Sequence, residues 1–87
     1  MEVLVKILAL QVDYFKKRPR RNNLNTAIEM SNKLQERMYQ EKLVHIADAI
    51  YSLRSKITDE KADGIAKEDI RNQLTEIAEF ALKEIKI

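Results

Sequence analysis

Two groups of residues in this 87-residue chain have the types and spacing that could support binding or chemistry. The first is basic, and its members are Lys16, Lys17, Arg18, Arg20 and Arg21. A segment of this kind can contact several phosphates, and an adjacent aromatic side chain can stack on a base. The net charge is +2, so the chain without these five cations would carry −3. Any affinity for polyanions is therefore concentrated in residues 16–21.

The second group is Glu41, His45 and Asp48, whose spacings of four and three place them on one face of a helix. Such a group could hold a divalent metal. However, the chain has one histidine, and it lacks both the His-Glu-x-x-His pattern of zinc proteases and the paired Glu-x-x-His motifs of di-iron bundles. We therefore interpret His45 as a partly exposed helical residue at the edge of the core and predict no metal site.

The composition does not indicate any other kind of catalytic site. The chain has no cysteine, which excludes thiolate nucleophiles and disulfides, and its single glycine excludes a glycine-rich phosphate loop. Ser31, Ser52 and Ser55 have no base in a recognisable arrangement. We predict no catalytic residue, no cofactor and no enzymatic activity.

The elements that position these groups have the patterns of helices. Residues 3–17 carry two apolar stripes at helical spacing, which are Val3, Ile7, Leu10 and Tyr14 in one and Val5, Leu8, Val12 and Phe15 in the other. An apolar surface this wide predicts cover from more than one side. Alternating β-branched residues also fit a buried strand, but no second strand exists to pair with it. Pro19 predicts the end of this helix, because it lacks an N–H and disfavours helical geometry at the preceding residue.

A second helix is predicted over residues 26–57, which contain neither glycine nor proline. Thr26 and Glu29 fit a capping box at its start. The clearest apolar pattern alternates spacings of four and three, as in coiled coils, through Tyr39, Leu43, Ile46, Ile50, Leu53 and Ile57. One continuous helix is the simplest interpretation, and a break near residues 37–42 is the alternative.

A third helix is predicted over residues 67–85, with a core stripe that comprises Ile70, Leu74, Ile77, Ala78, Ala81 and Ile85. Between the second and third helices, the sequence is compatible with a short helical turn over residues 58–63, and Gly64 has the position of a residue that ends a helix.

The sequence therefore predicts an all-α chain with one helical domain over residues 1–87. Two short helices would leave much of a long central helix uncovered, and monomers seldom expose so much apolar surface. We predict a three-helix bundle completed by dimerisation, with a self-association or partner face at Val3, Ile7, Leu10, Tyr14, Val44, Ala47 and Tyr51. The alternative is a compact four-helix monomer in which the long helix breaks.

These patterns favour a non-enzymatic adaptor, inhibitor or regulator that binds another protein through a helix face, as a homodimer. The alternative is a nucleic-acid-binding regulator that uses residues 16–21 as its electrostatic contact. The same cations also suit an acidic protein, an anionic membrane surface or a merely solvated turn. The longest apolar stretch is interrupted by polar and charged residues, and the N-terminus lacks the features of a secretory signal. We therefore predict no transmembrane segment and a cytoplasmic location.

Overall fold

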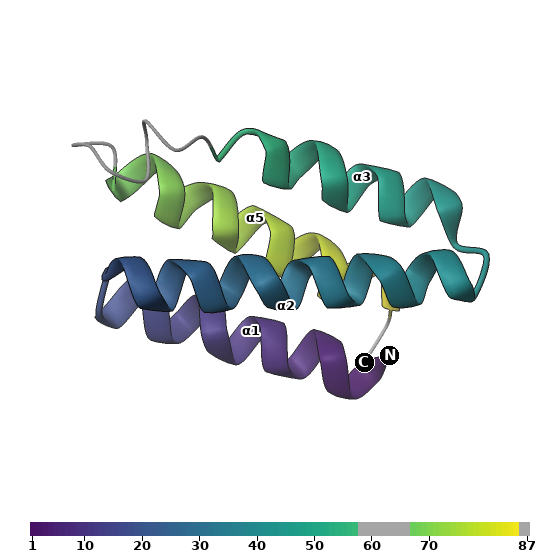
Figure 1. Cartoon of the computed structure of the whole chain (residues 1–87), viewed down its shortest axis with the longest axis horizontal. Coiled ribbons are helices and arrows are strands. Elements are labelled where there is room, and N and C mark those ends of the chain that lie inside the picture. The colour runs from purple at the N-terminus through teal and green to yellow at the C-terminus, as the bar shows by residue number, and fades with distance from the viewer. Residues whose placement is uncertain (58–66, 86–87) are drawn as a thin grey trace.

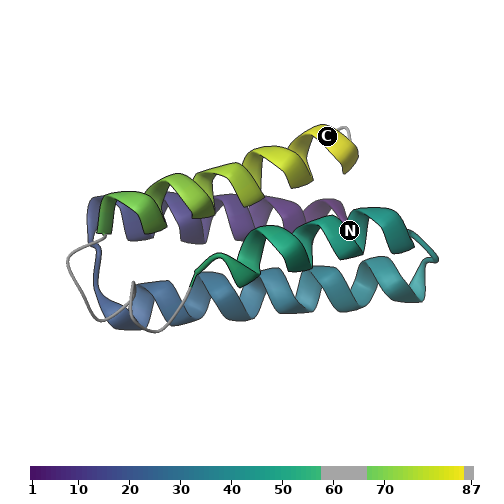
Figure 2. The same ribbon diagram turned by 90° about the horizontal axis from the view of Figure 1, so that it is seen from above.

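The computed structural model describes residues 1–57 and 67–85 of the chain. The described residues form four helices and no strand, which confirms the all-α class. The helices are α1 (Glu2–Lys17), α2 (Arg21–Gln40), α3 (Val44–Ser55) and α5 (Lys67–Ile85). Each runs antiparallel to the helix before it, so the described helices make an up-and-down bundle (Figures 1 and 2).

The four helices are arranged in a ring. α1 packs against α2 and α5, and α3 packs against the same two helices. α1 and α3 therefore lie diagonally across the bundle, at the bottom and the top of Figure 1. Their outer faces point to opposite sides of the molecule, and this separation determines which exposed residues can act together.

The prediction of three helices, with one continuous helix over residues 26–57, is wrong. α2 ends at Gln40, and Lys42 takes a positive φ of 64°. The Leu43 N–H donates to the Met38 carbonyl (2.8 Å) and the Lys42 N–H donates to the Tyr39 carbonyl (3.0 Å). These two bonds form a Schellman motif, which usually has glycine where Lys42 stands. The chain reverses at this point, and α3 folds back along α2.

α2 also begins earlier than predicted, at Arg21 instead of Thr26. The Thr26 hydroxyl donates to the Asn22 carbonyl (2.9 Å) within the helix, so it does not serve as an N-cap. The connection from α1 is a tight turn around Pro19, in which the Arg20 N–H donates to the Arg18 carbonyl (2.7 Å). Proline suits the central position of such a turn because its φ is already fixed.

The core lies between the four helices and contains one of the two apolar stripes predicted for α1. We call this stripe, which comprises Val5, Leu8, Val12 and Phe15, the inner stripe. Its buried apolar members are Val5, Leu8, Val12, Phe15, Leu24, Ala27, Leu34, Met38, Ala47, Ile50, Ile70, Leu74, Ile77, Ala78 and Ala81. Ser31 is also fully buried, and its hydroxyl donates to the Ile28 carbonyl (2.7 Å), which satisfies the polar group. The core stripe predicted for residues 67–85 is confirmed, with Ile85 half-buried at its end.

Of the residues in the predicted coiled-coil-like pattern, those from Leu43 onward lie toward the core. Ile50 is fully buried, and its neighbours in the pattern, which are Leu43, Ile46, Leu53 and Ile57, are half-buried against the core. Tyr39 lies on α2 instead and is 41% exposed. The short turn predicted for residues 58–63 and the helix end predicted at Gly64 lie outside the described residues.

Candidate interaction surface

The outer face of α1 carries a row of apolar side chains that is exposed to solvent. Val3 is 68% exposed, Leu10 67% and Tyr14 48%, and Ile7 between them is half-buried. At 100° per residue, this row is centred about 150° from the buried stripe of the same helix. An amphipathic helix that only covers a core has polar residues in that position. We call these four residues the outer stripe.

A hollow of about 380 Å³ lies on the outer stripe, lined by Leu10, Gln11, Asp13, Tyr14 and Lys17. Its charged rim is an exposed ion pair between Asp13 and Lys17, with 3.3 Å between the carboxylate and the ammonium. The Arg18 guanidinium lies 5.9 Å from the centroid of the Tyr14 ring, which is within the range of a cation–π contact. The lining therefore combines two apolar side chains, Leu10 and Tyr14, with three polar ones.

The rest of the predicted self-association face lies on α3 and does not join the outer stripe. Val44 is 46% exposed and Tyr51 is 56% exposed, but Ala47 is fully buried in the core. Because α3 is diagonal to α1, the exposed α3 residues lie on a different face, and Val44 shares with Val3 only the end of the bundle where both helices begin. The structure thus divides the seven predicted residues into the outer stripe, an α3 pair and one core residue.

Aromatic side chains on the α3 side of the bundle have polar partners within the chain. The Tyr39 hydroxyl donates to the Asp48 carboxylate, which links α2 to α3. This hydrogen bond, together with partial desolvation, raises the pKa of Tyr39 above its ordinary value. The Arg54 guanidinium lies 5.5 Å from the centroid of the Tyr51 ring, and burial lowers the pKa of Arg54. The Tyr39 contact thus joins the two helices of the α2–α3 hairpin, whereas the Tyr51 contact lies within α3.

The five cations of residues 16–21 all lie exposed at the end of the bundle where α1 meets α2. Lys16 and Lys17 occupy the last turn of α1, where the helix dipole favours positive charge. Arg20 is the N-cap residue of α2 and Arg21 is its first residue, and no acidic residue lies in that first turn. The Asn23 side-chain amide donates to the Arg18 carbonyl (2.7 Å) and holds the turn. The predicted basic loop is thus two helix ends joined by a short turn.

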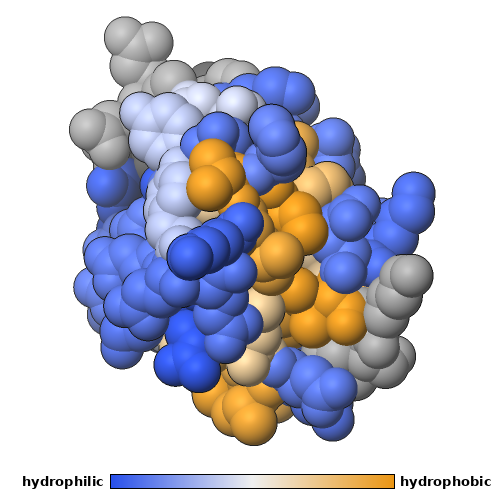
Figure 3. Space-filling view, turned by 90° about the vertical axis from the view of Figure 1, so that its right-hand side faces the viewer, coloured by the Kyte–Doolittle hydropathy of each residue, from blue (hydrophilic) through white to orange (hydrophobic). Residues whose placement is uncertain are grey.

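The opposite end of the bundle carries a band of hydrophobic residues with hydrophilic residues on either side (Figure 3), and we call it the apolar end. Val3 in the first turn of α1, Val44 in the first turn of α3 and Leu82 near the end of α5 are exposed, by 68%, 46% and 38% respectively. Val3 therefore belongs both to this end and to the outer stripe.

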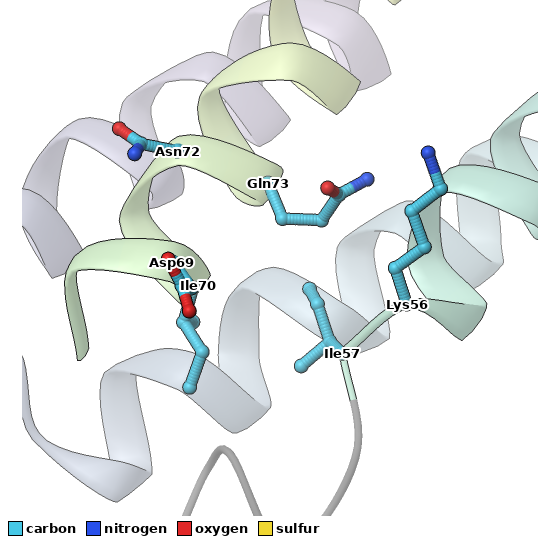
Figure 4. A pocket seen from close by; sticks show the side chains of 6 residues that line it. All are labelled: Lys56, Ile57, Asp69, Ile70, Asn72 and Gln73. Atoms are coloured by element: carbon cyan, nitrogen blue, oxygen red, sulfur yellow. The ribbon is translucent and has the colours of Figure 1, made fainter. Parts of the chain in front are cut away.

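A second hollow, of about 400 Å³, lies between the end of α3 and the start of α5. Figure 4 shows its lining, which is Lys56, Ile57, Asp69, Ile70, Asn72 and Gln73. The Gln73 side chain reaches across and donates to the Leu53 carbonyl (2.7 Å), which ties α5 to α3. The lining offers one ammonium, one carboxylate and two amides around two isoleucines, a composition that indicates no particular reaction.

The structure separates Glu41 from His45 and Asp48, the other two members of the group considered as metal ligands. Glu41 follows the end of α2, whereas His45 and Asp48 lie on α3, so the three residues do not share one helix. Across the described ranges 1–57 and 67–85, no three His, Cys, Asp or Glu side chains are grouped so as to hold a metal ion. Within the same ranges, no helix combines the length and hydropathy that a membrane span requires.

Comparison of the chain with protein-family models, with curated proteins and with solved structures gives no match. The function is therefore inferred from the residues themselves. Sequence reasoning identified the outer stripe as a candidate face, but it missed the hollow and the link between Tyr39 and Asp48. Finding the link required the position of the turn at residues 41–43, because that turn decides which residues of α2 and α3 face each other. The hollow lies on α1 alone and depends on the conformations of its side chains.

Proposed function

We propose that the chain is a non-enzymatic helical interaction protein that works as a homodimer through the outer stripe of α1. The observation that carries this proposal is the exposure of Val3, Leu10 and Tyr14 on the side of α1 away from the core. Contiguous exposed apolar surface of this kind marks an interaction site more often than a solvated face. A two-fold contact uses the same surface on both copies, so it would bury these side chains in each of them.

The break of the long helix changes the argument for a dimer. The dimer was predicted partly to cover a continuous helix over residues 26–57, and in the structure α3 itself covers α2. That surface of α2 therefore needs no second copy to cover it. The outer stripe still supports a dimer, because the packing of α2 and α5 against α1 leaves Val3, Leu10 and Tyr14 exposed.

The proposal is tested by one acidic substitution on each side of the bundle. Leu10→Asp places a carboxylate at the centre of the proposed contact, where desolvation of an unpaired charge costs several kcal/mol. We expect the dimer dissociation constant to rise by at least about a hundredfold. Val44→Asp is the matched control, because Val44 is exposed on α3 at the apolar end, and it should change the constant by less than about threefold.

Sedimentation velocity over a concentration series measures both constants, and circular dichroism checks that each variant remains helical. Dissociation by Val44→Asp with no effect of Leu10→Asp would move the interface to the apolar end of the bundle. Equal loss in both variants would show that the contact is not confined to α1. Either result would contradict the proposal.

The second candidate function is a nucleic-acid-binding regulator that uses the basic turn. It is favoured by the exposure of Lys16, Lys17, Arg18, Arg20 and Arg21 at one end of the bundle. The tight turn around Pro19 also fixes the backbone that carries them. Several cations held in one place can neutralise several phosphates and release their counterions.

Fluorescence anisotropy with DNA and RNA oligonucleotides at several salt concentrations tests this candidate. Arg20→Ala combined with Arg21→Ala should weaken binding and reduce the slope of log K against log salt by about 1 to 2. Lys33→Ala combined with Lys83→Ala removes two exposed cations elsewhere and serves as the matched control. No binding by the parent protein at low salt would remove this candidate.

A further inference from the structure

We infer that the partner of the outer stripe is a second copy of the chain whose α1 runs antiparallel to the first, related by a two-fold axis at the middle of the stripe. This inference rests on the proposed homodimer and specifies its geometry. It is carried by the spacing of the stripe, by the residues that line the hollow, and by the charges on either side of them.

The spacing of the outer stripe is symmetric about its midpoint. Its members, Val3, Ile7, Leu10 and Tyr14, follow one another at intervals of four, three and four residues. In an antiparallel pair centred between Ile7 and Leu10, Val3 of one copy lies opposite Tyr14 of the other, and Ile7 lies opposite Leu10. These alternating intervals are those of a coiled-coil seam, so both copies can present the same face to each other.

The hollow on α1 has the geometry that receives a side chain from such a helix. Leu10, Asp13, Tyr14 and Lys17, which line it, stand at positions i, i+3, i+4 and i+7. Four residues at these positions form the hole into which one side chain of a facing helix inserts. In the antiparallel register, the residue that faces this hole is Val3 of the second copy. Among the residues that the structure describes, Val3 is the most exposed of the large apolar side chains, at 68%.

The charges beside the stripe also favour this register. In the heptad of the outer stripe, Lys6 and Asp13 precede Ile7 and Tyr14 and lie on the same flank. Antiparallel helices bring such flanks together, so Lys6 of each copy would face Asp13 of the other. Asp13 already pairs with Lys17 at 3.3 Å, and a carboxylate can accept a second cation on its other oxygen. Because of the two-fold symmetry, the contact would contain two such pairs between Lys6 and Asp13.

A parallel alignment would bring the two basic turns together. Helices in contact lie about 8–10 Å apart, so ten cations would crowd at one end within roughly one Debye length of about 8 Å. In the antiparallel register, the two copies of Lys16 lie about 22 Å apart along the helix axes, which is more than two Debye lengths. Repulsion between the basic turns therefore disfavours the parallel dimer.

Disulfide trapping tests the register, because the chain has no cysteine. The variants are Val3→Cys and Asp13→Cys, which replace a knob and one wall of the proposed hole. Each is oxidised alone and then as an equal mixture, and intact-mass spectrometry distinguishes the two homodimers from the heterodimer. A disulfide needs Cα atoms within about 7 Å. We expect efficient trapping of the heterodimer in the mixture, because Asp13 is one wall of the hole that Val3 of the second copy enters in the antiparallel register.

Each other outcome has a distinct meaning. Trapping of Val3→Cys with itself at higher yield than the heterodimer would show a parallel dimer and overturn the inference. Dimers that are lost with Leu10→Asp but give no trapped species would overturn the register and leave the proposed function standing. A parent protein that sediments as a monomer would overturn the proposed function itself.

A charge exchange provides a second readout that requires no oxidation. Lys6→Asp alone should weaken the dimer by about three- to tenfold, because it sets two carboxylates opposite each other twice. Adding Asp13→Lys should restore most of that loss, because the opposite charges then face each other again. Failure of the second change to restore binding would contradict the pairing of Lys6 with Asp13.

Discussion

The outer faces of α1 and α3 carry similar residues in different settings. Each has a tyrosine close to half exposed or more, at 48% for Tyr14 and 56% for Tyr51, and each tyrosine has an arginine over its ring. On α1, however, the tyrosine continues an apolar row that runs opposite the core. On α3, the neighbouring Ala47 is buried, and Asp48 accepts a hydrogen bond from Tyr39. Exposure alone therefore does not identify an interface, whereas an apolar row opposite the core indicates one.

The largest expected difference between the two faces concerns dimer affinity. Tyr14→Ala removes an aromatic side chain from the proposed contact, where such residues often dominate the binding energy. We expect the dissociation constant to rise by about tenfold or more, and Tyr51→Ala to leave it within about twofold. Sedimentation velocity measures both. A larger effect of Tyr51→Ala would exchange the roles assigned to the two faces.

The turn that places α3 diagonally to α1 makes a prediction with a definite sign. Lys42 stands in the left-handed region, where glycine avoids a steric cost. Lys42→Gly should therefore stabilise the fold by about 0.5–1 kcal/mol, as measured by chemical denaturation. In a continuous helix, the same change would destabilise by about 1 kcal/mol. Lys42→Ala is the control, because alanine retains the Cβ that the left-handed region disfavours.

A smaller effect distinguishes the two exposed tyrosines of the α3 side. Tyr39→Phe removes the hydroxyl that donates to Asp48 and should lower the melting temperature by a few degrees. Tyr51→Phe keeps the ring beneath the Arg54 guanidinium and should leave the melting temperature unchanged. Thermal melts followed by circular dichroism compare the two variants. Equal shifts would show that the link between Tyr39 and Asp48 does not hold α2 to α3.

The smallest expected effect is a loss of folding stability at alkaline pH. The pKa of Tyr39 is raised in the folded state by its hydrogen bond to Asp48, so folding favours the protonated hydroxyl. This contribution to stability is complete below the ordinary tyrosine pKa of about 10 and is lost as the pH rises through the higher folded value. Asp48→Asn should lower the pKa of Tyr39. Absorbance titration, with Tyr39→Phe subtracted, measures that shift, and an unchanged titration would exclude Asp48 as its cause.

Much of the fold could be predicted from the periodicity of apolar residues. The inner stripe of α1 and the core stripe of α5 repeat at helical spacing, and burial in the core produces that spacing directly. The position of the break between α2 and α3 could not be predicted, because the turn contains no glycine or proline and uses Lys42 in an unusual backbone conformation. The sequence did permit a break near residues 37–42, but local propensities favoured a continuous helix.

The candidate site was predictable only in part, for a related reason. Val3, Ile7, Leu10 and Tyr14 form an outer stripe whatever lies beyond α1, because their spacing alone places them on one face. Val44, Ala47 and Tyr51 were grouped with them because a continuous helix would have left that patch uncovered. Once the turn at residues 41–43 folds α3 back, Ala47 enters the core and the other two lie across the bundle. Tertiary packing decides which exposed residues share a surface, and the periodicity of apolar residues does not reveal that packing.

The molar mass of the parent protein in solution tests the central claim most directly. The claim is that a second copy covers the outer stripe of α1. Sedimentation equilibrium at micromolar to tens of micromolar concentration should give a species of twice the 10.2 kDa chain mass, with dissociation on dilution. A single species of 10.2 kDa at every concentration in that range would contradict the account.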